Sequence, residues 1–366
     1  MSDHREQWQK LLEQLDQRQS LAEAMGGEEK VARQHERGRL TARERISRLF
    51  DADSFNEIGA LAGGNHPGGM SPLAGDGVVG GTGRVNGRTA VALAEDFTVK
   101  GGSIGHANAA KRARLVRLAQ EQLLPLVIIL DGAGERASNG EERYPSAPND
   151  LQLLADLQGR VPVVALVLGA SAGHGALTGM FADFIVMLDG ACLFTAGPPL
   201  VQAALGVQST PEELGSAHMH ATQSGVVHNR SASEQEAFEL ARRYLSMMPQ
   251  RAGDPCPVFG SGEPPGPPDH LLDLIPPSGA ETYDMCRVIT ALVDRDTLLE
   301  LQPDYGESLI CALARFAGRP CMIVANQPAK LAGAITHDAA EKAAHFITVA
   351  TAFGLPLVSL IDNPGV

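Results

Sequence analysis

The residues best suited to chemistry lie in a glycine-rich turn that follows an apolar run. The segment VPVVALVLGASAGHGALTG, residues 161–179, begins as a buried strand and reaches Gly173, His174 and Gly175 just before a helix of small residues. Small residues let a ligand approach the main chain, and the first turn of a helix has unpaired N–H groups. These donors suit an oxygen that acquires negative charge, so the turn can polarise a thioester carbonyl and hold the enolate formed at its α carbon. The alternative is that the glycines only let the helix pack tightly on the strand.

Two further glycine-containing segments can line the same site. KGGSIG, residues 100–105, can supply another backbone donor or cradle a phosphate, although it matches neither a Walker P-loop nor the dinucleotide fingerprint. DGAGER, residues 131–136, combines a turn with charges, and part of it can line a cleft. The substrate-binding candidates are Gly101, Gly102, Ser103, Gly132, Ala133, Gly134 and Gly175.

Other residues that often take part in chemistry receive structural interpretations. The helix expected after residue 105 carries four basic side chains, which we interpret as a solvated face that a nearby nucleotide phosphate could use. These are Lys111, Arg112, Arg114 and Arg117. His218, His220 and His228 lie close together in the sequence, but no acidic or cysteine ligand completes a metal set, and no metal site is expected. Ser171 lies in GASAG, residues 169–173, and we do not expect a serine hydrolase.

The composition is that of a globular protein of 366 residues with a net charge of -13 and 44% hydrophobic residues. The length predicts two domains, and the charge argues against nucleic acid as a partner. Five cysteines without a Cys-x-x-Cys pair predict reduced thiols and a cytoplasmic location. The polar start is neither a signal nor a transit peptide, and no apolar run reaches the roughly 20 residues that a membrane helix needs.

The chain divides into four predicted parts. These are an N-terminal helical arm over residues 1–50, a first domain over 51–248, a Pro- and Gly-rich linker over 249–280 and a second domain over 281–366. The arm places Trp8 and three nearby leucines on one face, typical of a helix that packs against other structure, and Thr41 and Glu44 have the spacing of a capping box. Residues 87–190 alternate β-rich runs with helical stretches, which predicts an α/β fold. The expected strands cover 89–94, 126–131, 161–168 and 184–188.

A search for self-similarity finds one unit used twice. Residues 87–134 align without a gap to residues 318–365, and 16 of the 48 pairs are identical, among them Lys111 with Lys342. Such a repeat predicts one supersecondary unit built twice. The second copy stops in mid-unit at LPLVSLIDNPGV, residues 355–366, an apolar strand without a covering helix. The sequence is therefore expected to be a fragment of a longer protein.

Motifs spread over nearly the whole chain resemble one known family, the carboxyltransferase (β) subunits of biotin-dependent acyl-CoA carboxylases of the propionyl-CoA or methylcrotonyl-CoA type. The motifs are GRLTARERI at 38–46, EDFTVKGGSIG at 95–105, DGAGER at 131–136, AGPPLVQAALG at 196–206, EELGSAHMHATQSGVVH at 212–228, ANQP at 325–328 and LIDNPG at 360–365. The resemblance implies two tandem crotonase-like domains of repeated ββα units, the second incomplete here. It also implies a hexamer, with each active site between the N domain of one subunit and the C domain of its neighbour.

The resemblance implies transfer of a carboxyl group from carboxybiotin to the α carbon of an acyl-CoA. In that reaction the biotin anion can take the α proton, so no protein base is strictly required. The family's catalytic main-chain pair falls on Gly173 and His174, and His174 stands where the family has a glycine. Ser171 stands where cysteine is common, and Leu177 where an aromatic residue is frequent. The family's second oxyanion hole, for biotin, is expected in the missing C-terminal part.

The partners follow from what the sequence lacks. It has no Met-Lys-Met-like biotinylation sequence and no ATP-binding loop, so biotin, its carrier and the biotin carboxylase are expected on other subunits. The first interpretation is carboxylation of a small or branched acyl-CoA, with AGPPLV at 196–201 leaning slightly towards the methylcrotonyl or geranyl type. The alternatives are a biotin-dependent acyl-CoA decarboxylase subunit, which runs the transfer in reverse, and a non-catalytic subunit that only holds the assembly together.

Overall fold

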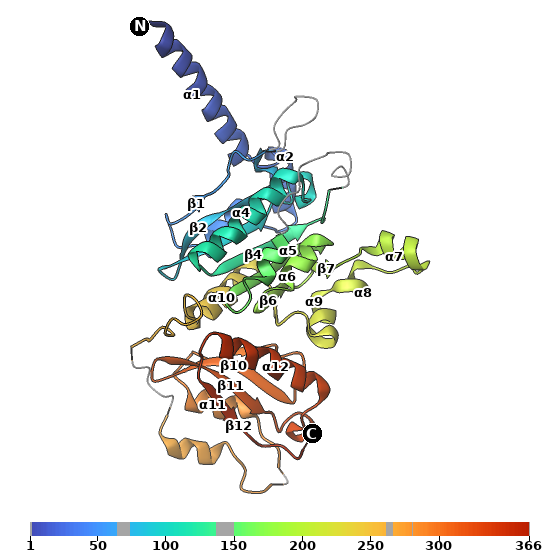
Figure 1. The fold of residues 1–366 in the computed structure, drawn as a ribbon. Helices are drawn as coiled ribbons and strands as arrows, with labels where there is room; N and C mark the ends of the chain where they lie inside the picture. The colour runs from blue at the N-terminus through green and yellow to red at the C-terminus, as the bar shows by residue number, and fades with distance from the viewer. Residues whose placement is uncertain (1, 64–73, 137–149, 261–265, 280, 366) are drawn as a thin grey trace.

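The structure is a computed structural model in which the strands form two sheets, stacked as the two bodies of an elongated molecule (Figure 1). It describes residues 2–63, 74–136, 150–260, 266–279 and 281–365. The helices are α1 (Ser2–Glu23), α2 (Glu28–Glu36), α3 (Ala42–Leu49), α4 (His106–Gln122), α5 (Asp150–Ala155), α6 (His174–Gly179), α7 (Pro198–Leu205), α8 (Pro211–Gly215), α9 (Ala217–Met219), α10 (Glu234–Met247), α11 (Met285–Leu292) and α12 (His337–Ala352). The strands are β1 (Asn56–Glu57), β2 (Val78–Val85), β3 (Arg88–Glu95), β4 (Leu126–Gly132), β5 (Val163–Ala172), β6 (Phe184–Leu188), β7 (Cys192–Phe194), β8 (Asn229–Ser231), β9 (Leu299–Leu301), β10 (Leu309–Phe316), β11 (Arg319–Asn326) and β12 (Leu357–Leu360).

The first sheet is built mainly of parallel strands. Its order is β1–β2–β3–β4–β5–β6–β8, with β7 beside β5. The pairs β1–β2 and β2–β3 are antiparallel, whereas those from β3 to β8 are parallel. The sequence predicts that β5 ends at residue 168, but the strand continues to Ala172 because its last three residues pair with β7. This extension carries β5 directly into the glycine-rich turn.

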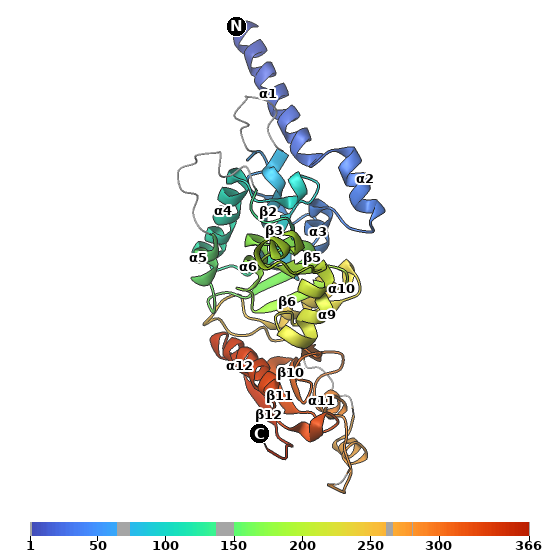
Figure 2. The same cartoon turned by 90° about the vertical axis from the view of Figure 1, so that its right-hand side faces the viewer.

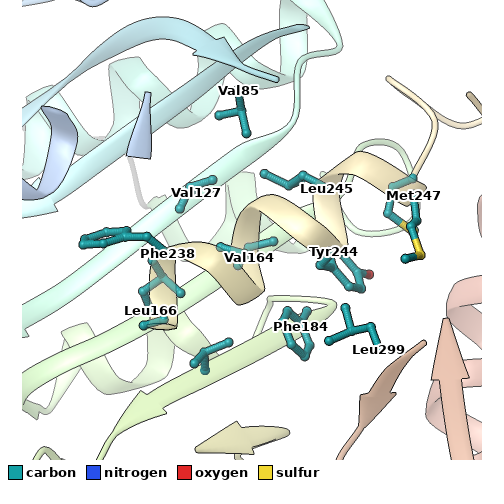
Figure 3. Packing of buried hydrophobic residues seen from close by; sticks show 14 of the residues in the cluster. Val85, Val127, Val164, Leu166, Phe184, Phe238, Tyr244, Leu245, Met247 and Leu299 are labelled. Carbon is teal, nitrogen blue, oxygen red and sulfur yellow. The ribbon is translucent and has the colours of Figure 1, made fainter. Parts of the chain in front are cut away.

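Helices cover both faces of the first sheet. All seven residues of β4 are buried, with Val127 on the side of α3 and α10 and Ile128 on the side of α4. Such burial on both faces is typical of parallel strands, and it explains their continuous apolar runs. Figure 3 shows one of these layers, with Phe238 and Leu245 of α10 lying over Val164 of β5.

The second sheet repeats the first in the same register. Its order is β12–β11–β10–β9, with an antiparallel β10–β11 hairpin in the place of β2–β3. Val91 pairs with Leu126 in the first sheet, and their aligned counterparts Met322 and Leu357 pair in the second. The helices α4 and α12 also begin at equivalent residues. The duplication that the sequence predicts is therefore present in the structure.

An apolar core joins the two bodies. Phe184 of β6 stacks on Tyr244 of α10 with 4.7 Å between the ring centroids, and Leu299 of β9 and Phe346 of α12 belong to the same cluster. Figure 3 shows Leu299 beside Phe184, and Figure 2 shows α12 on the side of the second body that faces the first. The two sheets thus share hydrophobic burial rather than only a connecting chain.

The N-terminal arm begins with an isolated helix and ends in a packed one. At α3 the predicted capping box is confirmed, because the Thr41 hydroxyl accepts from the Glu44 amide and the Glu44 carboxylate accepts from the Thr41 amide at 2.7 Å. α1, in contrast, projects away from the body (Figure 1), and its apolar face is open, with Trp8 66% exposed. The expected packing of that face is therefore absent within the described chain. Among the described residues, none of the helices has the length and the apolar content that a membrane span requires.

The segment that the sequence assigns to a linker contacts both bodies. The Ala252 amide donates to the Arg160 carbonyl at 2.9 Å, and the Phe259 amide donates to the Gly318 carbonyl at 2.9 Å. The Arg315 guanidinium lies 4.0 Å from the centre of the Phe259 ring, a cation–π contact. Ala252 and Phe259 therefore hold the segment against the two bodies. The domain boundaries on either side of it stay a prediction.

Candidate active site

Main-chain segments meet at the carboxyl ends of the neighbouring strands β3, β4 and β5. After β3, the short helix η2 (Lys100–Gly102) has positive φ angles at all its residues. The Ala133 amide, just after β4, donates to the Gly101 carbonyl at 3.0 Å. The Ile104 amide donates to the Gly134 carbonyl at 2.8 Å. The first two glycine-containing segments are therefore hydrogen-bonded side by side.

These segments approach so closely that glycine is required at the contacts. A Cβ at Gly102 would lie 2.4 Å from the Asp131 carbonyl oxygen, and one at Gly134 would lie 2.7 Å from the Ala172 carbonyl oxygen. The turn after β5 thus lies directly against the segment after β4. The structure brings together all the site residues that the sequence suggests in these three segments, while their roles stay predictions.

The turn after β5, called the α6 turn below, lies beside β7 and leads into α6. Gly173 is the N-cap of α6, with φ +57° and ψ −124°, a region that favours glycine. Its amide donates to the Phe194 carbonyl at 3.0 Å and is not free for an oxyanion. The main-chain amides of His174 and Gly175 have no hydrogen-bond acceptor among the described residues, as expected for the first turn of a helix. The predicted donor pair therefore shifts by one residue, from Gly173 and His174 to His174 and Gly175.

The His174 residue is fixed at both its side chain and its main chain. Its Nε2 atom donates to Asp150 Oδ1 at 2.6 Å, and the ring is 22% exposed whereas the carboxylate is 6% exposed. The Thr178 hydroxyl donates to the His174 carbonyl at 2.9 Å. The imidazole is therefore directed to α5 by a hydrogen bond to a buried carboxylate.

A buried arginine lies beneath the turn. Arg112 of α4 has no exposed surface, and its three hydrogen-bond partners are Asp150 (3.0 Å), Glu95 (2.8 Å) and Thr178 (3.1 Å). Through the first and third of these it supports both the ring and the carbonyl of His174. This corrects the interpretation of the basic residues of α4 as a solvated face: Lys111 and Arg112 are buried, and Arg114 is exposed.

The charges beneath the turn keep Asp150 ionised. Burial alone would raise the pKa of Asp150, but the hydrogen bond from His174 and the charge of Arg112 lower it to about 2. Burial raises the pKa of Glu95 in spite of the opposing charge of Arg112. The guanidinium is therefore shared between a firmly ionised carboxylate and one that is harder to ionise.

Helix α3 supports the same region from below. Because the capping box starts α3 at Ala42, Arg45 falls on its buried face. Arg45 donates to Asp131 Oδ2 and to Glu234 Oε2, both at 2.8 Å. A Cβ at Gly169 would lie 1.9 Å from Asp131 Oδ1, so glycine is also required there. This part of the N-terminal motif therefore holds the end of β4 in place.

The remaining candidate side chains are engaged locally. The Ser103 hydroxyl donates to a main-chain carbonyl at 2.7 Å. Ser171 is buried, and its hydroxyl has no hydrogen-bond partner among the described residues, so no base activates it there. His220 Nε2 bonds a main-chain carbonyl at 2.7 Å, and Nδ1 of buried His228 accepts from a main-chain amide at 3.0 Å. The nearby histidines of this segment thus make separate contacts.

Sequence reasoning missed the residues that support the turn. Asp150 precedes His174 by 24 residues and belongs to a different helix, so no local pattern joins them. Arg112 lies among other basic residues, which obscured its burial. One signal was available, because Glu95 directly follows an apolar run, and a carboxylate there is rarely buried unless it is paired.

Comparison with known proteins places this site in a family. Residues 33–366 match the family model described as the carboxyl transferase domain, a range that includes both sheets and the α6 turn. The chain belongs to the carboxyl transferase domain family. Its α/β fold is the crotonase-like fold that the sequence resemblance implies.

Curated relatives of this carboxyl transferase chain carry related names. The biotin-dependent acetyl-/propionyl-coenzyme A carboxylase beta5 subunit of Mycobacterium tuberculosis (strain CDC 1551 / Oshkosh) is 38% identical over 352 residues, which cover 93% of this chain and 64% of that protein. The methylmalonyl-CoA decarboxylase subunit alpha of Veillonella parvula is 34% identical over 362 residues, which cover 98% of this chain and 71% of that protein. The chain thus spans just under two thirds of the length of the first of these relatives.

Solved structures show the same arrangement of chain. The transcarboxylase 12S subunit, described as a hexamer with hydrolysed methylmalonyl-coenzyme A bound, has a TM-score of 0.90 at 34% identity, covering 97% of this chain and 71% of that one. The beta subunit of P. aeruginosa geranyl-CoA carboxylase has a TM-score of 0.56 at 25% identity, covering 98% of this chain and 66% of that one. This carboxyl transferase chain is therefore more similar to the 12S subunit than to the geranyl-CoA enzyme.

Proposed function

We propose that this chain transfers a carboxyl group between biotin and the α carbon of an acyl-CoA, as the carboxyltransferase subunit of an acyl-CoA carboxylase. The observation that carries the proposal is the α6 turn, where the amides of His174 and Gly175 have no acceptor among the described residues. Three glycine-containing segments meet around this turn. Membership of the carboxyl transferase domain family supports the same chemistry.

The amides of His174 and Gly175 would bind the thioester oxygen. That oxygen gains negative charge as the α carbon loses a proton, and donors fixed before the reaction stabilise the charge without reorganising. Loss of one such donor typically lowers the rate by about 10²–10³. Residues 132–134, which lie against the turn, and residues 101–103, which lie against the segment after β4, would line the path of the acyl-CoA.

Biotin, carried on another subunit, would be the carboxyl donor. When bound as carboxybiotin it would supply CO₂ to the enolate. A Cβ at Gly101 or Gly173 would have its nearest contact at 3.9 Å, so the described chain does not crowd the main chain at these two glycines. The role of this chain is to bind the thioester, to hold its oxygen and to leave the reacting face of the acyl group accessible.

A biotin-dependent acyl-CoA decarboxylase subunit is the second candidate. The Veillonella parvula relative carries a decarboxylase name at 34% identity, and the same transfer run in reverse would need the same turn. Purification of the native complex separates the two candidates. A copurifying ATP-dependent biotin carboxylase would indicate carboxylation, whereas a membrane-bound sodium pump would indicate decarboxylation.

The test is the conversion of methylmalonyl-CoA to propionyl-CoA with free biotin as carboxyl acceptor, followed by chromatography of the two thioesters. We expect turnover by the full-length wild-type protein and none by Gly173→Val, whose branched side chain would cover the turn. Gly190→Val is the control, because Gly190 also has a positive φ and open space around its Cβ but lies between β6 and β7.

Wild-type turnover by Gly173→Val would contradict the assignment of the turn. If the wild-type protein binds acyl-CoA but transfers no carboxyl group, the carboxyltransferase function is rejected. That outcome favours a subunit that only holds the assembly together.

We further infer the setting in which the chain works. We propose that the chain forms a homo-oligomer, because the similar transcarboxylase 12S structure is a hexamer. Biotin carboxylase and biotin carrier subunits are its proposed partners. All five cysteines are free, which suits a reducing compartment, and we propose a cytoplasmic location.

A further inference from the structure

We propose that the imidazole of His174 is the base that accepts the α proton of the acyl-CoA. The proposal rests on the proposed function and extends it by giving the proton a protein acceptor. The resemblance to acyl-CoA carboxylases implies that biotin can take this proton, with no protein base required. His174, which stands where that family has a glycine, would therefore add a group to the site.

The hydrogen bond to Asp150 determines which ring nitrogen is free. An ionised carboxylate can only accept, so Nε2 of His174 carries the hydrogen in their 2.6 Å contact. In the neutral ring the other nitrogen, Nδ1, is then an acceptor. Nothing in the described part of the chain donates to Nδ1. The ring thus offers an unpaired basic nitrogen on the same residue whose amide would bind the thioester oxygen.

His174 and Asp150 are buried to the different extents expected of a base and the group that orients it. The His174 ring is 22% exposed, whereas Asp150 is 6% exposed and Arg112 has no exposed side-chain surface. A partly accessible base held by a buried carboxylate follows the arrangement of known catalytic triads. His228 provides a contrast, because its ring is buried and its Nδ1 already accepts from a main-chain amide.

Charged groups of the surrounding elements lie next to this imidazole or to its hydrogen-bond partner. Asp150 of α5 accepts from the ring at 2.6 Å, and Arg112 of α4 donates to the same carboxylate at 3.0 Å. Glu95 of β3 binds Arg112, and Asp131 of β4 is bound by an arginine of α3. Asp150 and Arg112 are therefore positioning residues, which fix the tautomer and the direction of His174.

The proposed step balances without a further reactant. The bond between the α carbon and its hydrogen breaks, the proton moves to Nδ1 of His174, and the electron pair forms the enolate. The amides of His174 and Gly175 hold the enolate oxygen, and Asp150 stabilises the imidazolium. Because the ring is partly exposed, its new N–H can exchange with solvent before the proton returns. In D₂O the cycle would place deuterium on the α carbon with no biotin present.

The test measures deuterium incorporation into propionyl-CoA by NMR, with the full-length protein in D₂O and without biotin. We expect exchange by the wild-type protein, with a rate that rises with pH along a single ionisation. His174→Gln should lower the rate by about 100-fold or more, since general-base catalysis contributes about 10²–10⁴. Asp150→Asn should also slow exchange and alter the pH profile, because an amide no longer fixes the tautomer. The control is His337→Gln, whose side chain is 82% exposed at the start of α12.

The dissociation constant of propionyl-CoA, measured for each variant, separates proton transfer from binding. Exchange at the wild-type rate by His174→Gln would overturn the proposal. So would a wild-type protein that binds propionyl-CoA and transfers carboxyl groups without exchange, and in that case the proposed function stands. A wild-type protein that does not bind propionyl-CoA would overturn both. If His174→Gln fails to fold, a wild-type rate and pH profile in Asp150→Asn would reject the base.

Discussion

Two adjacent glycines of the turn after β3 should respond very differently to alanine. In the second repeat, Ala332 occupies the position of Gly101 with φ +52°, close to the +65° of Gly101, whereas Gly333 keeps the position of Gly102. A Cβ at Gly101 would have its nearest contact at 3.9 Å, an ordinary distance. A Cβ at Gly102 would lie 2.4 Å from the Asp131 carbonyl oxygen, so the backbone must shift. The internal repeat thus provides a natural precedent for alanine at one position only.

The magnitudes follow from these contacts. A positive φ costs a non-glycine residue about 1–2 kcal/mol, and the reduced freedom of the unfolded chain returns about 0.4–1 kcal/mol. Gly101→Ala should therefore lower the free energy of unfolding by about 1 kcal/mol. Gly102→Ala adds an overlap of the kind that costs about 1–3 kcal/mol, for a total of about 2–4 kcal/mol. Gly333→Ala should lose a similar amount, because its Cβ would lie 2.5 Å from the Asp362 carbonyl oxygen.

Urea unfolding followed by circular dichroism measures these differences. Gly333→Ala also separates stability from function, because it should destabilise the protein as Gly102→Ala does while leaving propionyl-CoA binding intact. An equal or larger loss of stability for Gly101→Ala than for Gly102→Ala would refute the steric reasoning.

Two further predictions concern buried charge. Arg112→Met should lower the free energy of unfolding by about 3–5 kcal/mol, because it removes the cation that pairs with two buried carboxylates. Its control, Arg114→Met at an exposed position, should change the free energy of unfolding by less than about 0.5 kcal/mol. Chemical denaturation measures both values. Burial raises the pKa of Asp183 from 3.8 to about 7, against the opposing hydrogen bond from the Val163 amide. The folded state therefore holds this proton more tightly, and its contribution to stability is lost as the pH rises from about 4 to 7. Asp183→Asn should be the more stable protein at pH 8, by at most about 4 kcal/mol, and lose that advantage at pH 4; an advantage that does not depend on pH would contradict this.

The duplicated architecture could be predicted because the two copies of the repeat align residue by residue without a gap. Lys111 and Lys342, paired in the alignment, are both buried, and each donates to a main-chain carbonyl at 2.6 Å. The two glycines Gly102 and Gly333 likewise meet equivalent carbonyl oxygens. Identities that recur at such demanding positions reflect the same backbone geometry, so they predict the fold better than composition does.

The support of the site could not be predicted, because it depends on contacts between distant elements. Arg112, Asp150 and His174 come from α4, α5 and α6, and only the packing of these helices against one another brings them together. The engagement of the Gly173 amide depends on β7 pairing with the end of β5, and the short apolar run of β7 gives no local signal for that pairing. The sequence therefore located the turn but not which of its amides are free.

We propose that main-chain amides of the α6 turn polarise the thioester carbonyl. Isotope-edited infrared spectroscopy of ¹³C=O-labelled propionyl-CoA, bound to the full-length protein, measures this polarisation. We predict that the carbonyl band of the bound thioester moves to lower wavenumber than in water, and that Gly173→Val abolishes this shift. A bound thioester whose carbonyl band stays at its position in water would contradict the account.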